Sequence, residues 1–123
     1  MEKILKIDEA TFDRFFDGYQ ITTNKQIIKL GISNGQSCCE EWGYFMSEDN
    51  FDRFIGSELL GVEIVDNCLS VKKVEHVYKG STMFVNIKTS VGLLQFTAYN
   101  DHNGYYGHDA VVISEQLKYE ETL

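Results

Sequence analysis

From Leu59 onward the sequence alternates short apolar runs with short turn segments, and this pattern limits the folds open to the chain. The runs cover residues 59–65, 68–78, 82–88, 93–99 and 108–114. Asp66-Asn67, Lys79-Gly80 and Ser90-Val91-Gly92 separate successive runs, and such residues favour turns. Strands joined by so few residues can pair only as antiparallel neighbours. This part of the chain therefore predicts an antiparallel meander.

The first half of the chain predicts helices as well as strands. Asp8 suits a helix N-cap, Gly18 suits a helix end, and apolar residues from Phe12 to Tyr19 recur at helical spacing. Those apolar residues are Phe12, Phe15, Phe16 and Tyr19. A second short helix is expected from Ser47 to Gly56, with Phe51, Phe54 and Ile55 on one side.

Residues 21–33 and 38–46 predict two more strands, which the Asn34-Gly35 turn would join as a hairpin. The chain contains no proline, no linker and no internal repeat. Residues 1–123 are therefore expected to form a single domain of the α+β class. Its antiparallel sheet would have about five to seven strands, with two helices packed on one face.

Composition excludes several classes of function. The net charge is −8 and Arg14 and Arg53 are the only arginines, so direct binding to nucleic acid is not expected. No apolar run reaches the roughly 18 residues of a membrane span, and the charged N-terminus is unlike a signal peptide. We therefore expect a cytoplasmic protein, with its three cysteines as free thiols.

The segment Tyr99–Asp109 is the richest in groups that bind ligands. A hairpin turning at Asn103-Gly104 would pair Tyr99 with His108 and place both on the polar face of the sheet. Asp101 and Tyr106 would share that face, together with Gln95 and Thr97 of the strand. Asn100, His102 and Tyr105 would lie on the other face at the turn. Further along the strands the opposite face would be the core face, carrying Leu94, Phe96, Ala98, Val111 and Ile113.

A second segment, residues 34–46, combines Cys38 and Cys39 with Trp42 and Tyr44. One cysteine could join His102 and His108 in a zinc site or act as a thiol nucleophile, but the spacing lacks the paired-cysteine pattern of zinc sites. The favoured interpretation is buried structural thiols. Carboxylate pairs drawn from Glu40, Glu41 and Asp101 carry little weight in so acidic a chain. No catalytic residue, metal site or cofactor is therefore expected.

Two motifs carry a resemblance to a known family. These are Cys38-Cys39-Glu40-x-Trp42-Gly43-Tyr44 and Tyr99-Asn100-x-His102-Asn103-Gly104-Tyr105-Tyr106-Gly107-His108. They resemble the signature of DUF7448, a family of small uncharacterised proteins from phages, prophages and mobile elements of Gram-positive bacteria. The resemblance implies a role in the phage–host conflict, in which small proteins trap cyclic ADP-ribose signals of Thoeris defence or inhibit CRISPR effectors. With only two arginines, a signal-trapping protein would have to bind through lysines, backbone amides and tyrosine stacking.

The leading hypothesis is a non-enzymatic anti-defence binding protein that sequesters a small polar or nucleotide-like ligand, a cyclic nucleotide included. The alternative is an acidic inhibitor of a host defence protein, of the anti-CRISPR or nucleic-acid-mimic kind. A thiol- or metal-dependent enzyme comes third. The oligomeric state stays open, a homo-oligomer included. The expected ligand-binding residues are Tyr99, Asn100, Asp101, His102, Asn103, Tyr105, Tyr106, His108, Trp42 and Tyr44.

Overall fold

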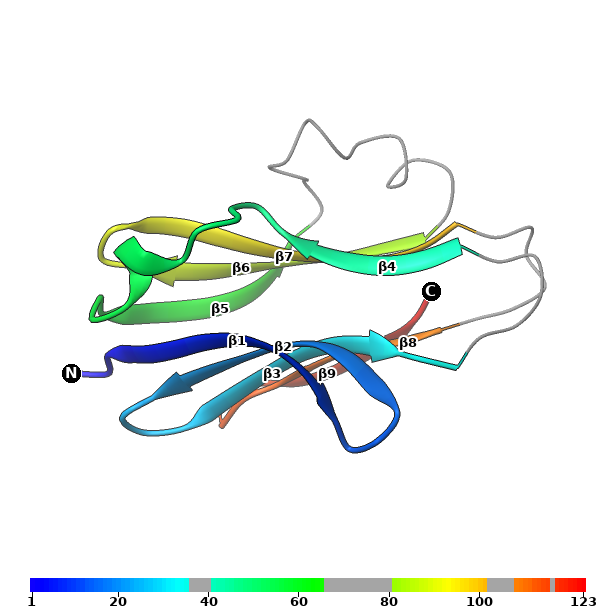
Figure 1. Cartoon of the computed structure of the whole chain (residues 1–123), viewed down its shortest axis with the longest axis horizontal. Helices are drawn as coiled ribbons and strands as arrows, with labels where there is room; N and C mark the ends of the chain where they lie inside the picture. Colours follow the sequence, from blue (N-terminus) through cyan, green and yellow to red (C-terminus); the bar gives the residue numbers. More distant parts are fainter. Residues whose placement is uncertain (36–40, 66–80, 102–107, 116) are drawn as a thin grey trace.

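The chain folds into two antiparallel β-sheets stacked face to face (Figure 1). The computed structural model describes residues 1–35, 41–65, 81–101, 108–115 and 117–123. The five-stranded sheet has the order β1-β2-β3-β8-β9, and the four-stranded sheet the order β4-β7-β6-β5. The strands are β1 (Ile4–Phe12), β2 (Phe16–Thr23), β3 (Ile27–Ser33), β4 (Glu41–Met46), β5 (Leu59–Val65), β6 (Ser81–Thr89), β7 (Gly92–Asp101), β8 (Asp109–Ile113) and β9 (Lys118–Thr122).

The predicted α+β class is wrong, because the described residues contain no α-helix. Their helical content is one 3₁₀ turn, η1 (Asp52–Phe54), which occupies part of the second predicted helix. That turn is followed by Gly56, whose φ of +85° fits the expected stop signal. Within the same part of the chain, no helix is long and apolar enough to cross a membrane.

The first predicted helix is instead a β-hairpin. Residues Phe12 and Phe16 pair across the turn between β1 and β2, and their rings stack with centroids 5.6 Å apart. The turn uses a left-handed backbone at Asp13 (φ 52°) and Arg14 (φ 67°). A spacing of four residues suits a helix face, but it also suits two residues opposite each other across a three-residue turn. Cross-strand aromatic pairing therefore overrides the helical pattern.

The predicted strands from Leu59 onward are largely confirmed. β5 covers the predicted residues 59–65, and β6 and β7 form the expected hairpin around Ser90-Val91. The predicted strand 68–78 lies outside the described residues. β9 was not predicted, because Lys118–Thr122 carries three charged residues and offers no apolar alternation.

Both hairpins predicted around the motif segments are wrong. β3 and β4 lie in different sheets, and so do β7 and β8, so the chain crosses between the sheets at these two connections. β3 pairs with β8 instead, from Lys29↔Ile113 to Ile32↔Ala110. β7 lies between β4 and β6. The strand ends at Ser33, Glu41, Asp101 and Asp109 lead into these crossings, and we call this end of the sandwich the crossover end (Figure 1).

The core lies between the two sheets. Ile21, Ile28 and Leu30 of one sheet are fully buried against Val85 and Phe96 of the other, in one continuous cluster. The predicted inward face of β7 is confirmed, since Leu94, Phe96 and Ala98 are all fully buried in this cluster. In β8 the inward residues are Ala110 and Val112 rather than Val111 and Ile113. The side chains of β8 that face the core are therefore shifted by one residue from the prediction, which exchanges its two faces.

Candidate functional site

The two motif segments meet at the crossover end, on the inner side of the sandwich. Trp42 of β4 and His108, which precedes β8, stack their rings with centroids 5.0 Å apart and planes 29° apart. One residue comes from the segment 34–46 and the other from the segment 99–109. The stack therefore joins the two sheets at this end.

His108 is buried rather than exposed, which corrects the expectation that it lies on the open polar face. The residue is only 3% exposed. Its Nδ1 lies 2.7 Å from the carbonyl oxygen of Ser33 and 3.2 Å from the Ser33 hydroxyl. A carbonyl can only accept, so Nδ1 carries the proton and donates it to Ser33. The ring is thereby fixed in one tautomer and one orientation.

Backbone contacts hold the same histidine from the opposite side. The N–H of His108 donates to a main-chain oxygen of Leu123 at 3.2 Å, and the N–H of Leu123 donates to the carbonyl of His108 at 2.7 Å. The Ser33 hydroxyl in turn accepts from the N–H of Asp109 at 3.0 Å. His108 is thus anchored to both the end of β3 and the residue after β9.

Asn100 extends this polar group into the second sheet. It is fully buried and lies opposite Trp42 in the β4–β7 register. Its Nδ2 donates to a main-chain oxygen of Leu123 at 3.2 Å. We call Trp42, His108, Asn100 and Ser33 the Trp42–His108 cluster. A buried polar cluster of this kind rigidifies its surroundings and requires its hydrogen-bonding groups to be satisfied.

Tyr44 lies farther along β4 in a second aromatic group. Its ring stacks on Phe96 and meets Tyr19 edge to face, and its hydroxyl donates to Glu9 Oε2 at 2.5 Å. Burial, followed by the hydrogen bond and charge of Glu9, raises the pKa of Tyr44 well above the ordinary tyrosine value. The pKa of Tyr19 is raised by burial and by Glu9 and Asp49. Both phenols are therefore protonated at neutral pH, and the Tyr44 hydroxyl acts as a hydrogen-bond donor.

Tyr99 points to the opposite side of the sheet from the Trp42–His108 cluster. Its ring packs near Phe45 and over Gly43, where an added Cβ would lie 2.6 Å from the Tyr99 hydroxyl oxygen. Together with Phe45, Phe84 and Val65 it forms a small apolar cluster on the outer face of the four-stranded sheet. Tyr99 therefore does not share a site with His108, contrary to the predicted hairpin.

The remaining predicted site residues fall outside what the structure describes. His102, Asn103, Tyr105 and Tyr106 lie in the segment 102–107, and of Asp101 only the strand position opposite Glu41 is described. The three cysteines, Cys38, Cys39 and Cys68, also lie outside the described residues. Among the residues that are described, no group of three histidine, cysteine or carboxylate side chains could hold a metal ion.

Sequence reasoning missed Ser33, Leu123 and Glu9 as partners of the predicted site residues. Each contributes a contact that depends on the pairing of β3 with β8, of β8 with β9, or of the two sheets. No local motif marks such long-range contacts.

Charged residues are mixed over the described surface. Ion pairs join Lys6 to Asp8 at 3.2 Å, Lys29 to Asp13 at 3.7 Å and Lys88 to Glu63 at 3.1 Å. Arg53 pairs with Glu48 near η1. Each of these pairs places a basic group beside a carboxylate on the described surface.

A family model described as "Domain of unknown function (DUF7448)" matches residues 2–112. No curated protein matches the chain. No solved structure matches it either.

Proposed function

Because this chain belongs to the DUF7448 family, whose description names no activity, we propose its function from its own residues: a non-enzymatic protein that binds a small polar or nucleotide-like ligand at the crossover end. The observation that carries the proposal is the Trp42–His108 stack, which ties the two motif segments to one rigid base. In the setting that the motifs suggest, the protein is encoded by a phage or mobile element and sequesters a defence signal.

Several features support binding at this end rather than elsewhere. Binding residues in β-sandwiches concentrate on connecting segments held by a rigid scaffold. Residues 36–40 and 102–107 connect the sheets here, and the second segment carries His102, Asn103, Tyr105 and Tyr106. The Trp42–His108 cluster lies at the strand ends from which both segments start, since Ser33 ends β3, Trp42 and Asn100 lie next to the ends of β4 and β7, and His108 precedes β8.

The proposal assigns different roles to the predicted site residues. Trp42, Asn100 and His108 are positioning residues, because Trp42 stacks on His108, His108 donates to Ser33, and Asn100 donates to Leu123. His102, Tyr105 and Tyr106 are the proposed ligand contacts, through hydrogen bonds and stacking on a planar group. Tyr44 and Tyr99 are left out of the contact set, because one packs against Glu9 and the other lies on the outer face.

The test separates contact residues from positioning residues. Native mass spectrometry of the protein purified from bacterial cytosol detects any retained ligand, and ADP-ribose and cyclic ADP-ribose serve as defined probes in thermal-shift titrations. The double variant Tyr105→Ala/Tyr106→Ala should keep the melting temperature of the parent and lose the ligand-induced shift. His108→Ala should lower the melting temperature and weaken binding as well.

Lys25→Ala provides the matched control, since Lys25 lies in the exposed turn between β2 and β3 at the opposite end of the molecule. It should bind as the parent does. Absence of any retained mass and of any shift with either probe would overturn the ligand-binding proposal. In that case a complex with a host defence protein would support the acidic-inhibitor alternative.

A further inference from the structure

A cavity opens at the opposite end of the sandwich, where β5 separates from the five-stranded sheet. The start of β5 is tied to the N-terminal segment, since the N–H of Leu59 donates to the carbonyl of Glu2 at 2.8 Å and the backbones of Lys3 and Glu58 form an isolated antiparallel β-bridge. Beyond that point the strand diverges and leaves a space of about 330 Å³. This volume lies at the lower end of the range for small-molecule sites.

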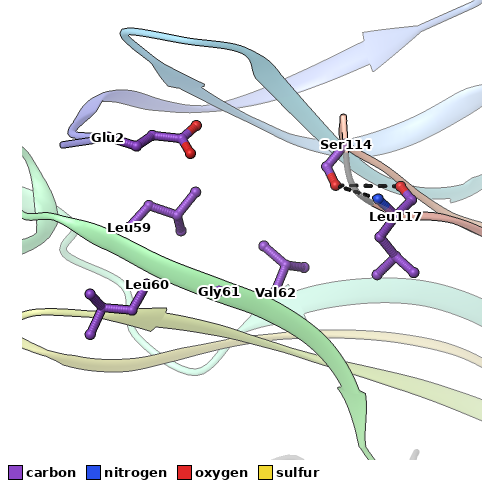
Figure 2. Close-up of a pocket in the computed structure, with 7 residues that line it drawn as sticks. All are labelled: Glu2, Leu59, Leu60, Gly61, Val62, Ser114 and Leu117. Carbon is purple, nitrogen blue, oxygen red and sulfur yellow. Dashed lines mark hydrogen bonds between the residues drawn. The ribbon is translucent and has the colours of Figure 1, made fainter.

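The walls of this cavity are mostly apolar, with one charged group (Figure 2). Leu59, Val62 and Leu117 present aliphatic side chains to the space, and the carboxylate of Glu2 points into it from the side of β1. Ser114 closes the far side, where its hydroxyl accepts from the N–H of Leu117 at 3.0 Å. Glu2 is the charged residue among those that line the cavity.

The carboxylate of Glu2 is held in place by the turn between β2 and β3. Its Oε2 accepts from the Thr23 hydroxyl at 2.6 Å and from Gln26 Nε2 at 2.8 Å. Gln26 is itself anchored, because its Oε1 accepts from the N–H of Glu115 at 2.8 Å. Two donors from this turn therefore orient the carboxylate, and one of them is itself anchored by Glu115.

The two oxygens of this carboxylate differ in their contacts with the described residues. Both hydrogen bonds end on Oε2, and within the residues that the structure describes Oε1 has no hydrogen-bond or ion-pair partner. An orientated carboxylate beside aliphatic walls selects a ligand with a cationic donor and an apolar body. A neutral apolar ligand would desolvate the charge without compensation, and an anion would be repelled.

We propose that this cavity is a binding site for a primary alkylammonium group, with Glu2 accepting from the ammonium and Leu59, Val62 and Leu117 contacting the alkyl chain. The group belongs either to a free alkylamine or to a lysine side chain of a bound peptide, since both present the same chemistry. The site lies at the end of the molecule away from the Trp42–His108 cluster and does not depend on the proposed function.

The experiment uses NMR titration of the full chain with n-hexylammonium chloride, with the peptide acetyl-Gly-Lys-Gly-amide, and with neutral n-hexanol. Up to about 10 mM probe detects even a Kd of about 1 mM. The expected result is saturable shifts of the backbone amides of Leu59, Val62 and Leu117 with the amine, the peptide or both, and none with hexanol. Shifts with the amine alone identify a free-amine site, and shifts with the peptide identify a lysine site.

Two variants decide whether Glu2 is responsible. Glu2→Gln retains the size and the oxygen that accepts from Thr23 and Gln26, and it should weaken binding by at least about tenfold. Glu58→Gln removes an equal charge just before β5, at the residue whose backbone forms a β-bridge with Lys3. This variant should bind the probes as the parent does. Equal affinity of the parent and Glu2→Gln, or no saturable shift at the cavity with either cation, would overturn the proposal.

Discussion

Within the described residues, His108 contacts the Trp42 ring, the Ser33 carbonyl and the backbone of Leu123. We predict that His108→Ala lowers the free energy of unfolding by about 1–3 kcal/mol, because it removes the ring stack and leaves the Ser33 carbonyl without this donor. Denaturant unfolding of parent and variant measures the change. His108→Phe retains a ring and should recover part of the loss, whereas unchanged stability in the alanine variant would contradict the buried position of His108.

Tyr44 gives a prediction about alkaline pH. Its pKa is raised, so the folded state favours the protonated phenol. That contribution is complete below the unfolded tyrosine pKa of about 10 and is lost as pH rises above it. We therefore expect the melting temperature to fall above about pH 10 in the parent, and less steeply in Tyr44→Phe.

Glu9→Gln tests the causes of this shift. Burial is its largest cause and Glu9 the next, so this variant should lower the pKa of Tyr44 only in part. Ultraviolet titration of the phenols in the parent and in each variant measures this change in the pKa of Tyr44. Identical alkaline profiles for the parent and Tyr44→Phe would contradict the assignment.

At the scale of elements, the β1–β2 turn stores backbone strain. Arg14 has a φ of 67°, a left-handed conformation that costs an ordinary residue roughly 1–2 kcal/mol. Because asparagine tolerates this conformation better, Arg14→Asn should stabilise the protein by up to about 1 kcal/mol. Phe15→Asn, in the same turn but without a positive φ, serves as the control in the same denaturant series. No gain in Arg14→Asn, or an equal gain in Phe15→Asn, would contradict the assignment of strain to Arg14.

The strands and their alternation were predictable where the pattern is local. β5, β6 and β7 follow from apolar runs bounded by turn residues, and the inward face of β7 follows from its period of two. The β1–β2 hairpin was not predictable in this way, because Phe12 and Phe16 fit a helix face and a cross-strand pair equally well. Only the pairing of β1 with β2 distinguishes the two.

The contact between the two motif segments was predictable in position but not in geometry. Its two segments were identified from their density of aromatic and polar residues, and Trp42 does contact His108. The sheet face on which each site side chain lies was not predictable. The prediction assumed that β7 and β8 pair, but they belong to different sheets. Because the assumed strand partner was wrong, His108 was predicted on the open polar face, whereas it is buried.

At the scale of the whole molecule, we expect repulsion from the net charge to affect stability more than the individual ion pairs do. The chain carries a net charge of −8, and its lysine–carboxylate pairs are largely exposed, so each contributes little. We predict that raising NaCl from about 20 to about 200 mM increases the melting temperature, because screening reduces the repulsion among carboxylates. Differential scanning calorimetry measures this, with Lys88→Gln as a check on one pair. A melting temperature that falls with salt would show that the ion pairs dominate.

The pairing of β3 with β8 also determines when the protein can finish folding. Ile32 and Ala110 face each other although their residue numbers differ by 78 (110 − 32). The unit β1–β2–β3 is made early in synthesis, but its sheet stays open at β3 until β8 emerges from the ribosome. Chain closure over such a separation is slow, on the order of milliseconds to seconds for β-sandwiches. During that interval one edge of β3 lacks its partner strand β8. The apolar residues of β3, which include Ile28, Leu30 and Ile32, are then open to association with other nascent chains.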